Sequence, residues 1–276
     1  MFFCGKKGSS DAVVAKLTNE TENTVLMMLN RLEKRIGVHA PTNFASAKLK
    51  LSSEKNFMLF ESLVPGAELY CSSSEKWVAA GTQLGKLQGT LWTGENDAYL
   101  SHWISLVEEK KIPDQKGLYL EKLKRAMRNM SYNPEFAKAI KKAVCILGSV
   151  PNVFSHGDLF PTNIIIDGEC VYFIDWANAA LLPYTMDIAR MICLPNIDGI
   201  DMCRNQDEVS EAYYTAIKPV LGKPFDSFMC DLYAAEIVEL GNMYCPPVGL
   251  NAMAIQCKGV FNQNIEKKLT VLATKI

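Results

Sequence analysis

Residues 154–176 read FSHGDLFPTNIIIDGECVYFIDW, and this stretch decides the fold. Two short apolar runs, at 164–166 and 171–174, are separated by a segment that begins with Asp-Gly, the pair favoured in tight type I′ turns. The pattern therefore predicts a β-hairpin. Because a hairpin brings its two ends together, we expect the side chains of Asn163 and Asp175 to converge at one end.

A third oxygen-bearing side chain, Asp158, lies on the loop five positions before Asn163. Three such groups at one spot are typical of a site for a hard cation, and Mg²⁺ is commonly held by one or two carboxylates together with phosphates and water. We expect Asn163 and Asp175 to bind the metal, which leaves Asp158 free to accept a proton from an attacking hydroxyl group. A purely structural alternative is that residues 156–158 form an Asx-turn and that Asn163 ends a strand.

The order His-Gly-Asp-Leu-x-x-x-Asn, hairpin, Ile-Asp-Trp resembles the catalytic segment of the aminoglycoside phosphotransferase and choline kinase superfamily, which is related to the protein kinases. The resemblance implies that Asp158 is the catalytic base and that His156 braces the loop. It also implies that Asn163 and Asp175 are the metal ligands. Asp187, in Tyr-Thr-Met-Asp-Ile-Ala, would hold the loop in shape, although it could instead cap the following helix.

The same resemblance places the nucleotide-binding lysine at Lys16, at the end of the apolar run AVVAKL. Such a lysine needs an acidic partner, and Glu22 is the candidate because it projects from the inward face of the next helix, with Glu20 as its substitute. Two alternatives remain open. Asn19 with Glu22 is also a capping-box pattern, and Lys16 could be an exposed lysine at a sheet edge.

Residues 56–69, NFMLFESLVPGAEL, resemble the strand and hinge that lie against adenine in this superfamily. The resemblance implies nucleotide contacts from Glu61, Ser62 and Leu63, and residues 84–88 resemble the helix that follows. One feature departs from the superfamily, which normally has a further strand and a phosphate-covering loop before the lysine hairpin. Here only 15 residues precede Lys16.

These patterns and the resemblance together predict an α+β, protein-kinase-like bilobal fold. The N-terminal lobe is expected to be a small antiparallel sheet with one helix, and the C-terminal lobe to be large, mainly helical and to contain the catalytic hairpin. We place the hinge at 64–66. Residues 1–64 are then a nucleotide-binding lobe without the first strand and phosphate loop, and residues 65–276 a catalytic and substrate-binding lobe. A hairpin is expected at the N-terminus, with its turn at 5–11. The other expected strands cover 12–17, 45–51 and 56–63. The expected helices cover 19–36, 77–91, 99–109, 118–130, 134–147 and much of the chain from 206 onward.

The composition is that of a globular protein, since 49% of the 276 residues are hydrophobic and 29 Lys and Arg balance 30 Asp and Glu. Without a basic run, a nucleic-acid partner is not expected. No apolar stretch approaches the roughly 20 residues of a membrane helix, so we expect a cytoplasmic protein without a membrane partner, as a monomer or homodimer. Nine cysteines without a CxxC pair predict reduced, mostly buried thiols.

The predicted reaction is Mg²⁺-dependent transfer of the γ-phosphate of ATP or GTP to a hydroxyl group of a small molecule, such as an aminoglycoside, an amino alcohol or a sugar-like compound. The alternative is a nucleotide-binding pseudokinase or regulatory module with little or no transfer. We expect the acceptor between the catalytic loop and the helices after Asp187. Acidic residues there would suit a cationic acceptor, or could simply form a solvated helix face: Asp198, Asp201, Asp207, Glu208 and Glu211.

Overall fold

The N-terminal part of the computed structural model is a four-stranded antiparallel sheet in the order β1-β2-β4-β3. Its strands are β1 (Phe2–Cys4), β2 (Val13–Thr18), β3 (Asn43–Lys48) and β4 (Phe57–Ser62). The pairing of β1 with β2 confirms the predicted N-terminal hairpin. The structure describes residues 2–4, 12–50, 55–92, 98–109, 116–195, 200–244 and 252–276, so the predicted turn at 5–11 and the predicted strand end at 51 lie outside the described residues.

The helix of this lobe, α1 (Glu20–Ile36), begins and ends where the sequence indicates. The Asn19 side chain accepts a hydrogen bond from the Glu22 backbone N–H, and Gly37 ends the helix in the left-handed conformation, with φ of 61°. The apolar face packs inward, and Val25 and Leu26 are fully buried. Local signals at both ends therefore determine this element.

The chain leaves the N-terminal sheet after Ser62 and enters the second lobe at β5 (Ala67–Glu68). Gly66 has φ of 116°, and a Cβ atom on it would lie 2.1 Å from the Ile166 carbonyl oxygen, so a side chain has no room there. Strand β5 pairs with β7 (Ile164–Asp167), which pairs with β8 (Cys170–Phe173). The hairpin predicted from Asp-Gly is thus confirmed, with β5 as a third strand.

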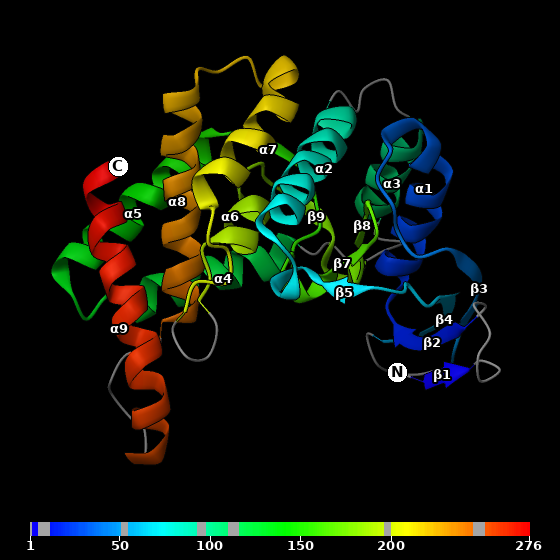
Figure 1. Cartoon of the computed structure of the whole chain (residues 1–276), viewed down its shortest axis with the longest axis horizontal. Helices are drawn as coiled ribbons and strands as arrows, with labels where there is room; N and C mark the ends of the chain where they lie inside the picture. Colours follow the sequence, from blue (N-terminus) through cyan, green and yellow to red (C-terminus); the bar gives the residue numbers. More distant parts are fainter. Residues whose placement is uncertain are drawn as a thin grey trace.

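The second lobe is mainly helical (Figure 1). A two-stranded sheet of β6 (Asn152–Ser155) and β9 (Ala180–Pro183) flanks the catalytic segment. The short 3-10 helices are η1 (Leu69–Cys71), η3 (Pro161–Asn163) and η4 (Trp176–Asn178). The helices are α2 (Ser74–Trp92), α3 (Ala98–Glu108), α4 (Lys116–Met130), α5 (Pro134–Ser149), α6 (Met186–Ile192), α7 (Gln206–Leu221), α8 (Phe225–Met243) and α9 (Ala252–Lys275).

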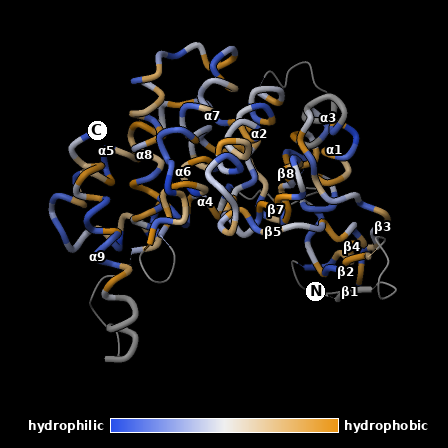
Figure 2. The backbone as a smooth tube through the Cα atoms, in the orientation of Figure 1, coloured by the Kyte–Doolittle hydropathy of each residue, from blue (hydrophilic) through white to orange (hydrophobic). Residues whose placement is uncertain are grey.

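Helix α8 is the centre of this lobe because it contacts α4, α5, α6 and α9. Helices α2 and α7 pack closely, since a Cβ atom on Gly85 would lie 2.7 Å from the Tyr213 carbonyl oxygen. Figure 2 shows the hydrophobic stretch of β7, whose Ile164 is fully buried. No helix within the described ranges is long and apolar enough to cross a membrane.

The cysteines that the structure describes are free thiols, as expected. Their burial differs from the prediction, because only Cys193 and Cys203 among them are buried, whereas Cys71 and Cys145 are exposed. Burial raises the pKa of the Cys203 thiol to about 12, which keeps it protonated and unreactive.

Candidate active site

The loop that carries Asp158 is held through its backbone by the side chain of Asp187, which lies in the first turn of α6. One oxygen of the Asp187 carboxylate accepts from the His156 backbone N–H at 2.7 Å, and the other accepts from the Gly157 N–H at 3.0 Å. Gln88 of α2 donates to the same carboxylate at 3.2 Å. Burial raises the pKa of Asp187, and His156 and the two N–H groups oppose that rise. The geometry favours the loop-holding role over a helix cap, since Thr185 occupies the N-cap position.

Gly157 has a backbone conformation that only glycine adopts easily, with φ of 78°. A Cβ atom there would lie 2.0 Å from the Asn178 carbonyl oxygen, which is far inside contact distance. Gly157→Ala should therefore lower the free energy of unfolding by at least about 2 kcal/mol and displace the loop. Urea unfolding monitored by circular dichroism measures the loss. Gly117→Ala is the matched control, because its Cβ atom would meet nothing within 4 Å, and an equal loss in both variants would contradict the explanation.

His156 ties the loop to the end of the hairpin. Its Nε2 lies 2.7 Å from the Ile174 carbonyl oxygen, and its Nδ1 accepts from the Asp158 N–H at 3.3 Å. The imidazole also packs on the Trp176 indole, with ring centroids 4.5 Å apart. Both hydrogen bonds fit the tautomer with its proton on Nε2. His156 thus contacts the backbone on both sides of the site, as a bracing residue would.

The carboxylate of Asp158 is oriented by an arginine that the sequence analysis missed. Arg190 of α6 places Nη2 2.6 Å from Asp158 Oδ1, and its Nη1 donates to Glu239 of α8. Its guanidinium carbon lies 4.1 Å from the centre of the Phe160 ring. Within the described part of the chain, the remaining oxygen, Asp158 Oδ2, has one long contact, of 3.5 Å, with the Asn178 amide. One signal existed in the sequence: Arg190 is three residues after Asp187, on the same helix face.

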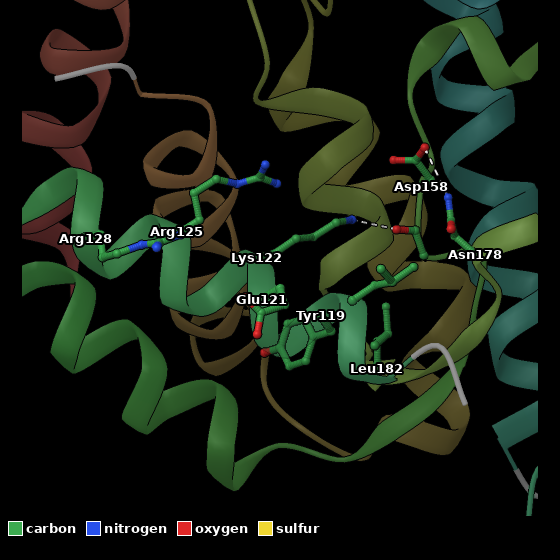
Figure 3. A pocket seen from close by; sticks show the side chains of 10 residues that line it. Tyr119, Glu121, Lys122, Arg125, Arg128, Asp158, Asn178 and Leu182 are labelled. Atoms are coloured by element: carbon green, nitrogen blue, oxygen red, sulfur yellow. Dashed lines mark hydrogen bonds between the residues drawn. The ribbon is translucent and has the colours of Figure 1, made fainter. Parts of the chain in front are cut away.

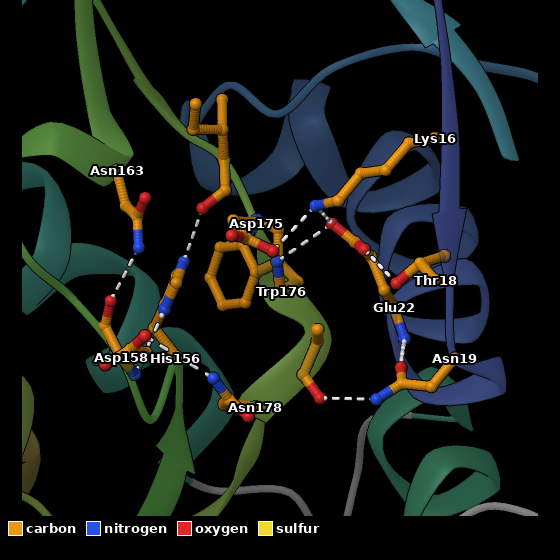
Figure 4. A network of polar contacts seen from close by, with 12 residues as sticks. Lys16, Thr18, Asn19, Glu22, His156, Asp158, Asn163, Asp175, Trp176 and Asn178 are labelled. Carbon is orange, nitrogen blue, oxygen red and sulfur yellow. Dashed lines mark hydrogen bonds and ion pairs between the residues drawn. The ribbon is translucent and has the colours of Figure 1, made fainter. Parts of the chain in front are cut away.

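Lys16 lies between two carboxylates (Figure 4). Its Nζ is 2.8 Å from Glu22 Oε1 and 2.6 Å from Asp175 Oδ1, so the predicted Lys16–Glu22 pair is present. Burial alone would lower the pKa of Lys16, but the charges of Glu22 and Asp175 outweigh it and raise that pKa. The substitute, Glu20, pairs with Lys48 instead. Lys16 is not at a sheet edge, because β2 lies between β1 and β4.

Glu22 connects the two lobes. Its carboxylate is fully buried and accepts hydrogen bonds from the Thr18 hydroxyl and from the Trp176 backbone N–H. Asn19 donates to the Ala177 carbonyl oxygen at 2.9 Å. One half of the capping-box alternative is therefore confirmed, because the Asn19 side chain caps the helix. The other half is not, because the Glu22 carboxylate binds Lys16.

Asp175 immediately follows the hairpin and has φ of 64° and ψ of 59°. It is the one residue other than glycine with positive φ in the described part of the chain. Aspartate tolerates this left-handed conformation better than most residues do. The turn separates the hairpin from η4 and directs the carboxylate toward Lys16 (Figure 4).

The two ends of the hairpin meet through their backbones, while the predicted convergence of the Asn163 and Asp175 side chains stays a prediction. The Ile174 N–H donates to the Asn163 carbonyl oxygen at 3.0 Å, and the Asn163 amide donates to the Asp158 carbonyl oxygen at 2.8 Å. No hydrogen bond from a described residue engages Asn163 Oδ1 or Asp175 Oδ2. An amide oxygen and a carboxylate oxygen fit Mg²⁺, which takes oxygen ligands and completes its shell with phosphates and water. Among described residues there is no group of three or more His, Cys, Asp or Glu side chains that could hold a metal ion.

The three residues expected at the adenine have different environments. Glu61 is buried, its Oε2 lacks a hydrogen-bond partner in the described residues, and burial together with the charge of Glu22 raises its pKa to about 7. The Ser62 N–H donates to Thr42, and the Leu63 N–H donates to Ala12. These two residues can therefore offer a nucleotide backbone carbonyls and side chains, but not those N–H groups.

Asp158 opens into a cavity of about 420 Å³ between the catalytic loop and α4 (Figure 3). The expected acidic wall is elsewhere, because Asp207, Glu208 and Glu211 line separate hollows that do not include Asp158. Asp201 is paired with Lys268 at 2.6 Å, and Asp198 lies outside the described residues. These acidic residues do not line the cavity at Asp158, because α7 packs along α2, and the position of the acceptor stays a prediction.

Comparison with known proteins identifies the family and supports the fold. Residues 11–220 match the model of a phosphotransferase enzyme family, and no curated protein matches the chain. Amicoumacin kinase hAmiN, solved with AMP-PNP, Ca²⁺ and Ami, is 12% identical, with a TM-score of 0.61 over 95% of this chain and 82% of that one. Plasmodium vivax ethanolamine kinase is 15% identical, with a TM-score of 0.54 over 96% and 78%.

A spectinomycin phosphotransferase, APH(9)-Ia, solved with ADP and spectinomycin, is 13% identical, with a TM-score of 0.53 over 99% of this chain and 89% of that one. At such low identities these likenesses show a shared fold. The family match, in contrast, covers well over half of the sequence and contains the loop, the hairpin and Lys16. The chain therefore belongs to the phosphotransferase enzyme family.

Proposed function

We propose that this protein transfers the γ-phosphoryl group of ATP or GTP to a hydroxyl group of a small molecule, with Mg²⁺ as the required ion. The observation that carries the proposal is the position of Asp158: one carboxylate oxygen is held by Arg190, and the carboxyl group opens into a cavity large enough for a small molecule. The other oxygen, Oδ2, is then the atom that accepts the proton of the attacking hydroxyl group.

Lys16 is the proposed contact to the phosphates of the nucleotide. An ammonium group has three N–H donors, and two of them point to Glu22 and Asp175, which leaves one for a phosphate oxygen. Glu61, Ser62 and Leu63 are the proposed contacts to the rest of the nucleotide, and residues 1–64 the nucleotide-binding lobe. The lobe that begins at residue 65 would hold the acceptor.

Asn163 and Asp175 would hold the Mg²⁺, which when bound neutralises charge on the transferred phosphoryl group. His156 and Asp187 keep the loop in place through backbone hydrogen bonds. We further propose a cytoplasmic monomer or homodimer that acts on small molecules rather than nucleic acids, because the net charge of −1 provides no attraction for phosphate backbones.

A second candidate is a nucleotide-binding module without transfer. One observation favours it: Asp158 and Asp175 each have an oxygen engaged in an ion pair, with Arg190 and Lys16 respectively. The expected lack of a phosphate-covering loop does not decide between the two functions, since residues 5–11, where a turn is predicted, lie outside the described residues.

The two functions can be separated with γ-labelled ATP or GTP, Mg²⁺ and a panel of aminoglycosides, amino alcohols, sugars and hydroxy acids. We expect label to appear in one class of acceptor and to disappear when EDTA removes Mg²⁺. Thermal denaturation with and without Mg·ATP measures nucleotide binding in the same preparation. A nucleotide-dependent shift without transfer to any acceptor would favour the binding module and contradict the kinase.

A further inference from the structure

One face of α4 carries three cations at intervals of three residues. Lys122, Arg125 and Arg128 all line the cavity into which Asp158 opens. Residues three apart lie on the same side of a helix, about 4.5 Å apart along its axis. The three side chains therefore form a row that starts beside the catalytic loop and leads away from it (Figure 3).

The row begins in contact with the loop itself. Lys122 Nζ donates to the Gly157 carbonyl oxygen at 2.7 Å, one residue before Asp158. Burial lowers the pKa of Lys122, the charge of Arg190 adds to this, and Glu239, Asp158 and Asp187 oppose it. A negatively charged group brought into the cavity would favour the protonated form of this lysine.

The next cation is held in position for a ligand. Arg125 Nε donates to Asn242 Oδ1 at 2.5 Å, which fixes the guanidinium group through a single N–H and leaves its terminal nitrogens for other acceptors. Arg128 is exposed, and its guanidinium group makes no ion pair within the described ranges. Planar guanidinium groups bind carboxylates and phosphates through paired N–H donors.

The carboxylates that line the cavity do not balance these charges. The lining contains Glu121 and Asp158, and each already has a cation of its own from outside the lining. Glu121 pairs with Lys124 at 2.7 Å, and Asp158 pairs with Arg190 at 2.6 Å. The lining holds three cations against two carboxylates. Glu239 and Asp187 also act on Lys122, so the excess of positive charge lies at Arg125 and Arg128, where it disfavours an aminoglycoside or amino alcohol cation.

We infer that the acceptor carries a carboxylate or phosphate group in addition to its hydroxyl group, and that Arg125 and Arg128 bind this anionic group. The inference rests on the proposed function, because it assigns the acceptor to the cavity at Asp158. The spacing of the row places the anionic group several bonds from the hydroxyl group that Asp158 activates. A volume of about 420 Å³ accommodates a compound of this size.

The test uses matched probes that differ in one charged group: gluconate against glucose, and glycerol 3-phosphate against glycerol, with ethanolamine and kanamycin as cations. Isothermal titration calorimetry measures their binding to the full chain with Mg·AMP-PNP present, so that anions do not occupy the phosphate site. Transfer from γ-labelled ATP gives kcat and KM for the same compounds. Binding and turnover are thus measured independently.

The variants are Arg128→Gln, which removes an exposed cation that forms no ion pair with a described residue although its charge acts on Glu121, and Arg125→Gln/Arg128→Gln. We expect the double variant to weaken the binding of gluconate or glycerol 3-phosphate by roughly 10- to 100-fold and to raise their KM similarly, while glucose and glycerol are unaffected. Lys138→Gln is the matched control, because it removes one positive charge from the exposed surface of α5, outside the cavity. Circular dichroism confirms that each variant is folded.

The possible failures are distinguishable. Transfer to ethanolamine or kanamycin at equal rates in the wild type and the double variant would overturn the anionic acceptor while leaving the kinase function intact. Equal binding of the anionic probes to both proteins would also overturn it. Binding that depends on the two arginines, without transfer to any acceptor, would support the anion site and reject the proposed function.

Discussion

Asp158→Asn should lower kcat for phosphoryl transfer by roughly 10²- to 10⁴-fold, because the amide cannot accept the proton of the attacking hydroxyl group. The change preserves shape: an amide oxygen can still accept from Arg190, whose Nη2 lies 2.6 Å from Asp158 Oδ1. The backbone of the loop is held separately by Asp187. We therefore expect the fold and nucleotide affinity to be nearly unchanged.

The measurement combines steady-state transfer of labelled phosphate with calorimetric binding of Mg·AMP-PNP. Asp167→Asn is the matched control, since this carboxylate lies at the turn end of β7 and takes no part in the proposed reaction. Its turnover should equal that of the wild type. Full activity in Asp158→Asn would show that another group accepts the proton.

Asp175→Asn should reduce transfer by more than about 100-fold, because it removes the carboxylate proposed to hold Mg²⁺ and one of the two anions that orient Lys16. Asparagine is the informative replacement. Asparagine adopts the left-handed backbone at least as readily as aspartate, so the turn with φ of 64° is kept and the substitution removes only the negative charge. Alanine at the same position would add backbone strain.

The dependence of kcat on Mg²⁺ concentration separates the two roles of Asp175. If it binds the metal, the Mg²⁺ concentration for half-maximal activity should rise in Asp175→Asn but remain unchanged in Glu22→Gln, which removes the other partner of Lys16. Equal Mg²⁺ midpoints in Asp175→Asn and the wild type would mean that Asp175 serves only as an ion-pair partner of Lys16.

Elements with strong local signals were predictable from the sequence. The hairpin follows from Asp-Gly between two apolar runs, and α1 follows from Asn19, its apolar spacing and Gly37, because each depends on neighbouring residues. Boundaries shifted by a few residues, as for β3, which begins at Asn43 rather than at 45. The fold class could also be predicted, because the order of the Lys16 strand, the Asp158 loop and the hairpin along the chain is typical of one topology.

The site was predictable only in part. The order of Asp158, Asn163 and Asp175 along the chain located the loop and hairpin, and the helix face of Glu22 indicated its pairing with Lys16. The partner of Asp158 was not accessible, because Arg190 reaches it only when α6 packs against the catalytic loop. The sequence of the loop and hairpin thus indicates which side chains can take part in the reaction, but not which charged groups from other elements surround them.

From its sequence alone, this protein was determined to have two lobes, a catalytic hairpin and a set of polar residues suited to phosphoryl transfer, since hydrophobic spacing and turn residues act over short distances along the chain. The tertiary structure decided the electrostatic character of the cavity at Asp158. Helix α4 looks like an ordinary amphipathic helix in the sequence, and only its packing against α8 and β9 brings Lys122, Arg125 and Arg128 to the cavity beside Asp158. Charges interact through space, so their effect on a substrate depends on positions that only the folded chain defines.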